Sequence, residues 1–589
     1  MSYFHDSVVK LLTLQINDII SDDAIRRNLQ MSRKGYGDLA LHCFTEAQAT
    51  NVSANGLASI VAETVIPGGL IESVESIGGF VNFSLNRQLA TEMTLRKALT
   101  DPAFGSSDIG QGRLVVVEFS APNTGKPMHV GHIRSTIIGD SVSRCLGFTG
   151  HRVHRLNYTG DIGLHMGKVM AAYERWSDPR ALKERPMEEM LDLYVRFNTE
   201  ASSDPSLASE AQIVLREFEE GNEDVLKTWK LIRDASMDTF EPVYDTLDVQ
   251  FDEVTGQSLF IDAGKRVVAE AVEKGVARRL TEGAASSDAT IVDDLEDETE
   301  VSEGAVIAVL QRHGLPDKVI LRSDGTATYS TQDLGAAVSR RASLGFDSMI
   351  YVVGDEQRLY FQQIFKILEL LGYEWVSDCV HIPFGHLKLE GSKMSSRLGN
   401  IVSLDEVLAT AIRRAAKIAE SKDSGDFTEE EINSIAKAVG IGALKYSILS
   451  TEHIKEVNFS WESALDFDAN SAPYTQYTHA RASRLLARAM MADSPPPPQV
   501  PSQISDHEFA LIRQIDEFPD VILDCALNFR IHRLAHYLSG LSNSFGDFYN
   551  SERIFGSPEQ EFRLALTAAV KNVIGTGLWL LGIAAPEKM

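Results

Sequence analysis

The stretch from Leu114 to Leu146 constrains the fold most, because it joins a short apolar run to a helical pattern through a polar loop. Leu114 to Phe119 is rich in β-branched residues, as expected for a parallel strand covered on both faces. From Ile133 onward, apolar residues recur at helical spacing. The order strand, loop, helix predicts a nucleotide-binding β-α unit, and with it an α/β fold.

The loop of this unit carries its polar groups. Pro122, Gly125 and Pro127 break regular structure, and the run His129-Val130-Gly131-His132 falls where the helix should begin. The unpaired N–H groups of a helix start attract phosphate. Two histidines three residues apart at a helix start are more often capping or packing residues, so this motif alone leaves a structural role open.

A second cluster, Gly391 to Arg397 (GSKMSSR), follows the strand-like Leu387 to Leu389 about 260 residues downstream. In this order the two clusters resemble the HIGH and KMSKS signatures of class I aminoacyl-tRNA synthetases. Glu118 to Asn123 (EFSAPN) is similar to the corresponding segment of arginyl-tRNA synthetases in particular. The resemblance runs over most of the chain.

This resemblance implies three units. We expect a small N-terminal α/β domain that contacts tRNA over 1–112, a Rossmann-like catalytic domain over 113–404 with a helical insertion at about 170–318, and an all-α helical bundle that binds the anticodon over 405–589. The implied enzyme is an ATP-dependent arginine–tRNA ligase, which forms arginyl-adenylate and then arginylates tRNA(Arg). The alternatives are a class I synthetase for another amino acid, a smaller nucleotidylyltransferase with the same first motif, and a non-catalytic tRNA-binding protein derived from a synthetase.

The family signatures also imply which residues hold ATP. His129 and His132 would donate to phosphate oxygens, and Gly131 would let the backbone approach the nucleotide. From the second signature, the expected contacts are Lys393, Met394, Ser395 and Ser396. Magnesium is expected with ATP, held mainly by the phosphates, with no metal bound tightly by the protein.

Arginine recognition requires acceptors for a planar cation with five N–H donors. Asp333 is the first candidate for this carboxylate, and Tyr329, one helical turn earlier, would add its phenol. At the other end of the substrate, Asn123 and Gln357 are expected to bind the ammonium and carboxylate groups. The family motif also includes Glu118, Ser120 and His132 in the arginine site.

The second signature departs from KMSKS, because Ser396 stands where the family has its second lysine and Arg397 follows it. Another cation must then stabilise the negative charge that builds on pyrophosphate in the transition state. Lys126, three residues before His129, is the candidate, and many family members with an altered second signature resemble this chain in carrying a lysine there. The alternatives are that Lys126 is a solvated loop residue or that Arg397 compensates by itself.

Beyond Leu404 the pattern is helical, with predicted helices over 432–449, 471–491, 509–529 and 562–581. In the second of these, aromatic and polar side chains that suit stacking on unpaired bases are expected to contact tRNA: Tyr474, Gln476, Tyr477 and Arg481.

Upstream, Val319 to Arg322 and Ala327 to Tyr329 are predicted to form a hairpin on the Asp324-Gly325 turn. Gln257 stands where the family commonly has glutamate, which leaves its contact open.

The net charge of −27 argues against a polyanionic partner, but part of the acid is concentrated in 288–300, so a basic path elsewhere stays possible. The four cysteines are far apart and show no metal-ligand spacing, which argues against a structural zinc site or a disulfide scaffold. The sequence shows no membrane span and no secretory signal, so we expect a cytoplasmic protein, and we expect a monomer.

Overall fold

The computed structural model describes residues 3–32, 36–281, 291–292, 303–389, 403–422, 427–468, 470–490 and 497–589. Its central layer is a parallel sheet whose described strands lie in the order β13-β12-β5-β6-β7. Their bounds are Leu114–Glu118 (β5), Arg152–Thr159 (β6), Glu253–Gly256 (β7), Ser348–Gly354 (β12) and Cys379–Phe384 (β13). Numbered along the chain, this order is 3-2-1-4-5 reversed, which confirms the predicted Rossmann-like fold.

The strand and helix predicted at the first motif are confirmed. Strand β5 has its last four residues buried, and α6 (Val130–Phe148) buries most of its side chains between the sheet and the C-terminal helices. The core beside α6 includes Val117, Ile133 and Val142. Since β5 is the middle strand, the loop that follows it lies at the centre of the sheet's carboxyl edge.

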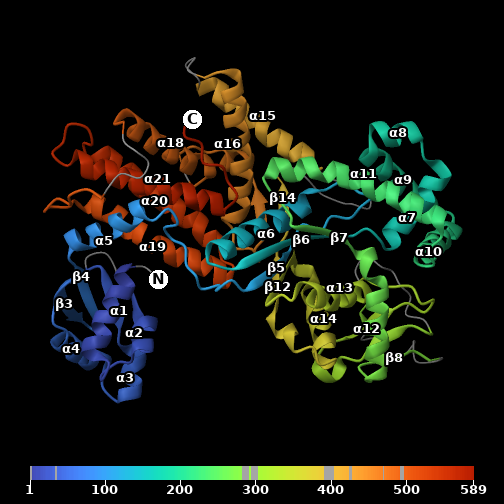
Figure 1. Cartoon of the computed structure of the whole chain (residues 1–589), viewed down its shortest axis with the longest axis horizontal. Coiled ribbons are helices and arrows are strands. Elements are labelled where there is room, and N and C mark those ends of the chain that lie inside the picture. Colours follow the sequence, from blue (N-terminus) through green and yellow to red (C-terminus); the bar gives the residue numbers. More distant parts are fainter. Residues whose placement is uncertain are drawn as a thin grey trace.

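Helices fill the crossover from β6 to β7 and form the lobe that extends away from the sheet in Figure 1. They are α7 (Leu164–Trp176), α8 (Pro179–Glu184), α9 (Pro186–Ala201), α10 (Pro205–Glu219) and α11 (Glu223–Leu247). The predicted insertion over about 170–318 is therefore too long, because β7 returns to the central sheet at Glu253. The four-residue strand was missed because it is short and only partly buried.

Between β7 and β12 the chain builds a second lobe, seen below the central sheet in Figure 1. Its strands pair in the order β8-β10-β11-β9. The elements are α12 (Ile261–Glu273), β8 (Ala277–Arg279), β9 (Ile291–Val292), β10 (Val306–Ala308), β11 (Asp317–Leu321) and α13 (Tyr329–Leu344). Helix α14 (Arg358–Leu370) follows β12 and packs against β13 and α13.

The predicted hairpin in this lobe is wrong. The turn exists, since Gly325 N–H donates to the Arg322 carbonyl at 3.0 Å, but no strand returns from it. Instead Thr328 caps α13, its hydroxyl accepting from Thr331 N–H at 3.2 Å. The start of a helix immediately after the turn leaves no room for a strand.

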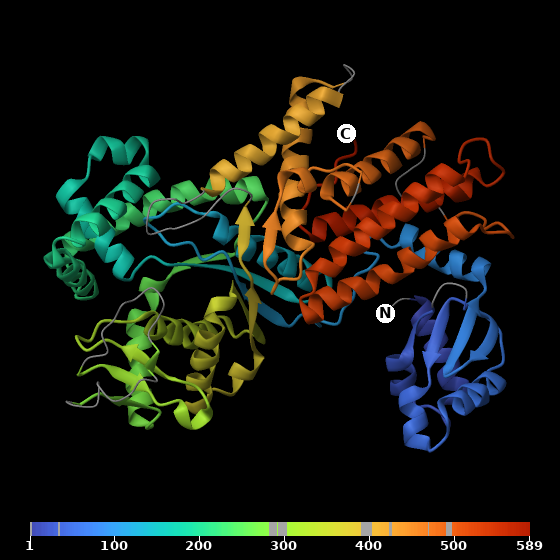
Figure 2. The same cartoon turned by 180° about the vertical axis from the view of Figure 1, so that it is seen from behind.

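The N-terminal module is an antiparallel sheet, β1-β2-β4-β3, covered by helices. Figures 1 and 2 both show it at the far end of the molecule from the α12–α14 lobe, beside the C-terminal helices. Phe4 N–H donates to the Asp516 carboxylate at 3.1 Å across this junction. The bounds are α1 (Tyr3–Ile16), α2 (Asp22–Asn28), β1 (Leu29–Met31), β2 (Leu39–His42), α3 (Phe44–Thr50), α4 (Ala54–Thr64), β3 (Ile71–Ile77), β4 (Phe80–Leu85) and α5 (Arg87–Thr100).

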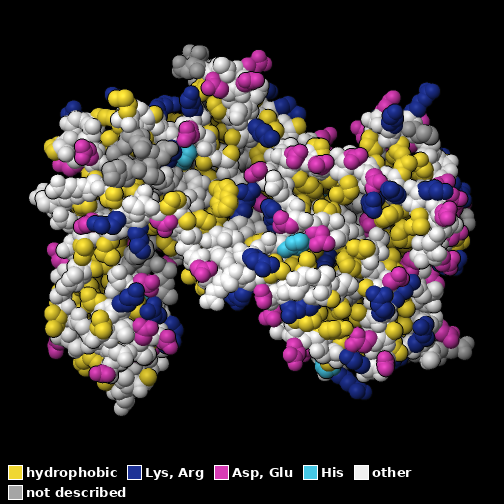
Figure 3. Space-filling view, in the orientation of Figure 1, with side chains coloured by type: hydrophobic (Ala, Val, Ile, Leu, Met, Phe, Trp, Pro, Cys, Tyr) yellow, Lys and Arg dark blue, Asp and Glu magenta, His cyan; other side chains and the backbone are white. Residues whose placement is uncertain are grey.

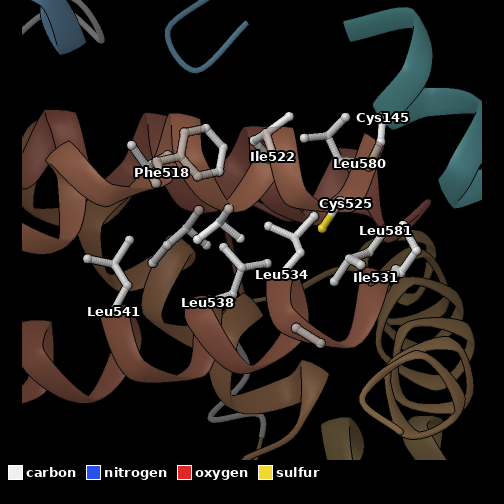
Figure 4. Close-up of a cluster of buried hydrophobic side chains, with 14 of the residues drawn as sticks. Cys145, Phe518, Ile522, Cys525, Ile531, Leu534, Leu538, Leu541, Leu580 and Leu581 are labelled. Atoms are coloured by element: carbon white, nitrogen blue, oxygen red, sulfur yellow. The ribbon is translucent and has the colours of Figure 1, made fainter. Parts of the chain in front are cut away.

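The C-terminal part is helical, as predicted, apart from β15 (Val457–Phe459), which pairs in parallel with β14 (Leu387–Leu389). Figure 4 shows apolar side chains of α19, α20 and α21 packed together, with Cys145 of α6 at the edge of the cluster. The helices are α15 (Leu404–Lys422), α16 (Glu429–Leu449), α17 (Trp461–Ala464), α18 (Ala472–Arg488), α19 (Asp506–Asn528), α20 (Ile531–Ser551) and α21 (Gln560–Leu580). Among the helices of the described residues, none has the length and hydropathy that crossing a bilayer requires.

Candidate active site

The order of the strands places the site. Strands β5 and β12 are neighbours although long segments separate them in sequence, and their connections leave on opposite sides of the sheet. Ligands of doubly wound folds bind at this switch point, beyond the carboxyl ends of the strands. The segments there are the loop from Phe119 to His129 after β5 and the turn at Asp355–Gln357 after β12.

The loop after β5 is strained and firmly held. Ser120 and Ala121 have positive φ values of 75° and 48°, which non-glycine residues rarely adopt. The Ser120 N–H donates to the hydroxyl of Ser135 at 2.9 Å, and the Ala121 N–H donates to the side-chain oxygen of Asn157 at 3.2 Å. These bonds to α6 and β6 keep the reversed backbone in place, so the following residues run along the carboxyl edge of the sheet.

The two histidines cap α6 with their own side chains. The Gly131 N–H donates to His129 Nδ1 at 3.0 Å, and the His129 N–H donates to His132 Nδ1 at 3.1 Å. Burial, reinforced by Lys126, lowers the pKa of His129 to about 4; burial followed by His129 and Lys126 lowers that of His132. Both rings are therefore neutral with the proton on Nε2, which makes each Nε2–H a donor for a phosphate oxygen.

Lys126 lies beside these rings, and its Nζ is 4.4 Å from the ring centroid of Tyr194 on α9. The same ammonium contributes to the lowered pKa of His165 at the start of α7, after burial, which brings that value to about 3. Three neutral imidazoles, one cation and a helix N-terminus thus share one region. Such a set attracts a polyphosphate.

A second part of the site lies at the start of α13. Asp333 Oδ2 accepts from the Tyr360 hydroxyl at 2.5 Å, whereas its buried Oδ1 has no hydrogen-bond partner among the described residues. Burial raises the pKa of Asp333 to about 7. One turn earlier, the Tyr329 ring lies against Gly163, where a Cβ would be 2.9 Å from the Tyr329 hydroxyl. A buried carboxylate oxygen that lacks a donor suits a cationic ligand.

Glu118 is also buried, but its oxygen is already paired, with Arg340 Nη1 at 2.5 Å. Burial raises the pKa of Glu118, and Arg340 opposes that rise. The guanidinium lies 4.3 Å from the Tyr158 ring centroid, and its Nε and Nη2 have no acceptor among the described residues. Arg340 therefore offsets the charge of Glu118, while the direct partner of Asp333 is a phenol.

The other three residues predicted to bind arginine, Asn123, Gln357 and Ser120, differ in burial and in hydrogen bonding. Asn123 packs on Gly160, where a Cβ would be 2.1 Å from its Oδ1, and Gln357 is exposed after β12. The Ser120 hydroxyl is buried between the hydroxyls of Tyr244, at 2.8 Å, and Thr136, at 3.0 Å. The Ser120 hydroxyl is thus engaged within the protein, and the contact of Ser120 with arginine stays a prediction.

The second signature, with Lys393, Met394, Ser395, Ser396 and Arg397, lies outside the described residues. The chain is described again from Ser403 to Lys422. The His129 backbone pairs with Ser403, and the Leu404 N–H donates to the Met128 carbonyl at 3.0 Å. Ser403 and Leu404, the first described residues after this segment, therefore pair with the backbone at the start of the first signature.

Comparison with known proteins decides the family. Residues 94–461 match the model of tRNA synthetases class I (R), catalytic domain, and residues 475–589 match the DALR anticodon binding domain. The chain is 34% identical over 599 residues to an arginine–tRNA ligase of Clostridioides difficile, with 100% of both chains covered. The chain belongs to the arginyl-tRNA synthetase family. It is thus a class I aminoacyl-tRNA synthetase, and neither a synthetase for another amino acid nor a non-catalytic derivative is favoured.

Two further relatives agree. An arginine–tRNA ligase of Halothermothrix orenii is 34% identical over 590 residues, and 100% of both chains is covered. The solved structure of Thermus thermophilus arginyl-tRNA synthetase superposes with a TM-score of 0.80 at 25% identity, covering 99% of this chain and 100% of that one. As members of this family use ATP, the anion-attracting region at the start of α6 has an evident ligand.

The residues predicted to contact tRNA lie on α18. The Arg481 guanidinium is between two rings, 4.7 Å from the centroid of Tyr477 and 4.9 Å from that of Tyr549. The prediction for Gln476 is wrong. Its side chain is fully buried and donates to the Ala438 carbonyl of α16 at 3.0 Å and to the Ala584 carbonyl of the C-terminal segment at 2.8 Å, so it joins these segments to α18 rather than facing a ligand.

Several residues of the site gave no local signal in the sequence. Arg340, Tyr194 and His165 reach it from α13, α9 and α7, through contacts that link distant segments. On the face in Figure 3, basic and acidic side chains are interspersed rather than gathered by sign. The net charge of −27 therefore does not correspond to a uniformly acidic surface on this face.

Proposed function

We propose that this chain activates L-arginine with ATP and transfers the arginyl group to the 3′ end of tRNA(Arg). The observation that supports this most is the buried Oδ1 of Asp333, an acceptor without a hydrogen-bond donor among the described residues. In this proposal the arginine guanidinium supplies the missing donors. Tyr329 adds a polar contact, and Asn123 and Gln357 bind the ammonium and carboxylate.

In the first step the arginine carboxylate oxygen attacks the α-phosphorus of ATP, and the bond from that phosphorus to the oxygen bridging the β-phosphate breaks. The products are arginyl-adenylate and pyrophosphate, whose leaving oxygen takes up negative charge. His129 and His132 donate from Nε2 to phosphate oxygens, and Lys126 offsets the charge on the leaving group. Gly131 keeps the helix start open to the nucleotide, because a Cβ there would lie 2.8 Å from the His129 ring.

The second signature completes the ATP site in this proposal. Lys393, Met394, Ser395 and Ser396 close on the nucleotide, and Arg397 adds charge near the pyrophosphate. Magnesium would be held mainly by the phosphates of ATP, and Lys126 would add positive charge to the same balance. In the second step the terminal ribose hydroxyl of tRNA attacks the arginyl carbonyl and AMP leaves.

For the rest of the molecule, we propose that 1–112 and 405–589, which lie beside each other, both contact tRNA. Tyr474, Tyr477 and Arg481 form a base-stacking surface on α18. We further propose that the protein acts in the cytoplasm as a monomer.

Charge selectivity tests the proposal directly. Citrulline has a neutral ureido group with nearly the shape of the guanidinium. With ATP, magnesium and tRNA(Arg), the chain should form acid-precipitable arginyl-tRNA, and citrulline should give no product under the same conditions. Equal charging with citrulline would remove the buried carboxylate from the recognition of arginine.

A further inference from the structure

The loop that carries Lys126 rests on the helices between β6 and β7. The Gly125 N–H donates to the Ser236 hydroxyl of α11 at 3.0 Å, and the Thr124 hydroxyl contacts the Met166 sulfur of α7 at 3.3 Å. Gly125 has a φ of 75°, and a Cβ there would meet Met166 and Val169 at 3.4 Å. The backbone before Lys126 is thus held by two helices of this lobe.

The Lys126 side chain meets a third helix of the same lobe. Its Nζ is 4.4 Å from the ring centroid of Tyr194, a residue that is 9% exposed and packs in an apolar cluster that includes Met190 and Leu215. A lysine side chain has four rotatable carbons and loses much entropy when it is fixed. Contact with a ring that is packed in an apolar cluster restricts the ammonium, whose charge contributes to the lowered pKa values of His129 and His132.

We propose that Tyr194 is a positioning residue, whose ring face holds the Lys126 ammonium where the departing pyrophosphate of the proposed reaction develops its charge. This inference rests on the proposed function and assigns the helices between β6 and β7 a part in the chemical step. The tyrosine touches neither ATP nor arginine in this account. It acts through the lysine, so its loss lowers the rate of activation rather than the binding of substrate.

The expected effect follows from the strength of a partly buried cation–π contact. Removing the ring face should lower kcat for arginine activation by about 3- to 30-fold. The KM values for arginine and ATP should stay within about twofold. Tyr194→Phe retains the aromatic ring face and should keep at least half of the parent rate. If the hydroxyl group of Tyr194 were the important feature, this variant would lose as much rate as Tyr194→Leu.

The test is arginine-dependent pyrophosphate exchange by the full chain, with saturating tRNA, for Tyr194→Leu and Tyr194→Phe. Trp176→Leu is the matched control, because the Arg196 guanidinium lies 4.4 Å from the Trp176 centroid in the same helical lobe. If thermal melting shows that Tyr194→Leu does not fold, Tyr194→Met is measured instead, because methionine fills the apolar cluster without an aromatic face. The Trp176 control should retain the parent rate.

A double variant separates positioning from general damage. In the Lys126→Ala background, Tyr194→Leu should cause no further loss, because the group it positions is gone. An undiminished or increased rate of Tyr194→Leu, equal losses in the Phe and Leu variants, or additive losses in the double variant would each overturn the proposal. If the parent chain itself shows no arginine-dependent exchange, the proposed function fails before any Tyr194 variant is compared.

Discussion

Replacing Asp333 by asparagine should weaken arginine binding far more than ATP binding. The substitution keeps the size of the side chain and an oxygen for the Tyr360 hydroxyl, but it removes the negative charge from the buried site. Losing one charge-assisted contact of this kind costs about 2 to 4 kcal/mol. That corresponds to a rise of roughly 30- to 900-fold in the KM for arginine at pH 8.

The pH dependence of the KM for arginine tests the same role of Asp333 in a second way. The pKa of Asp333 is raised from its ordinary value of 3.8 to about 7, so its carboxyl is neutral below that pH in the empty site. Arginine affinity should therefore approach its maximum about one pH unit above 7 and should fall as the pH drops through 7. At pH 6 about a tenth of the groups are ionised, so the parent KM should rise roughly tenfold.

Steady-state exchange between pH 6 and 8.5 measures both effects, with the KM for ATP as the internal reference. Asp333→Asn has no carboxyl to titrate at this position. Its KM for arginine should therefore not change with pH over this range, except where the KM for ATP changes in the same way in both enzymes. Equal rises in the arginine and ATP KM values would make Asp333 a structural residue. A parent KM that is independent of pH would refute the reasoning on its charge.

Three other predictions follow from named contacts. Lys126→Ala should lower the activation rate by roughly 100- to 1,000-fold with modest changes in KM, and Ser396→Lys should recover part of that rate; a loss of only a few fold would assign the role elsewhere. Arg340→Met leaves a buried carboxylate unpaired and should reduce the free energy of unfolding by about 3 to 5 kcal/mol in urea titrations, so a loss below about 1 kcal/mol would contradict the pairing. Arg481→Ala should raise the KM for tRNA roughly 5- to 150-fold, whereas exposed Arg484→Ala on the same helix should not; equal effects would locate tRNA elsewhere.

Local features of this fold could be predicted from sequence because their causes are local. Strand β5, its loop and helix α6 form one continuous stretch, and the apolar periods and glycine and proline positions are readable there. The hairpin prediction failed although its Asp324-Gly325 turn is real. Thr328 begins a helix directly after the turn, so turn chemistry alone did not determine what followed.

The pairing of charges in the site could not be predicted in this way. Glu118 and Arg340 are 222 residues apart, and only the packing of α13 against the sheet brings them together. The family resemblance implied Glu118 as a ligand of arginine, whereas in the structure its carboxylate is paired with the Arg340 guanidinium. Gln476 failed for a similar reason: a polar residue among tyrosines suggested a surface, whereas the fold uses its amide to join three segments.

Helix α20 shows the opposite case, a signal that was present and not used. Ile531, Leu534, Leu538 and Leu541 are buried and recur every three or four residues. Histidines, serines and a glycine lie between these positions, and the predicted helices do not include this segment. Apolar spacing was the better guide, since the polar residues occupy the other faces of the helix.

The most direct measurement of the central claim is pyrophosphate exchange with each amino acid, with and without tRNA(Arg). Members of the family typically need tRNA to activate arginine, so we predict exchange with arginine when tRNA is present and background exchange with the other amino acids. Robust exchange with a different amino acid, or no arginine-dependent exchange in either condition, would contradict the proposed function.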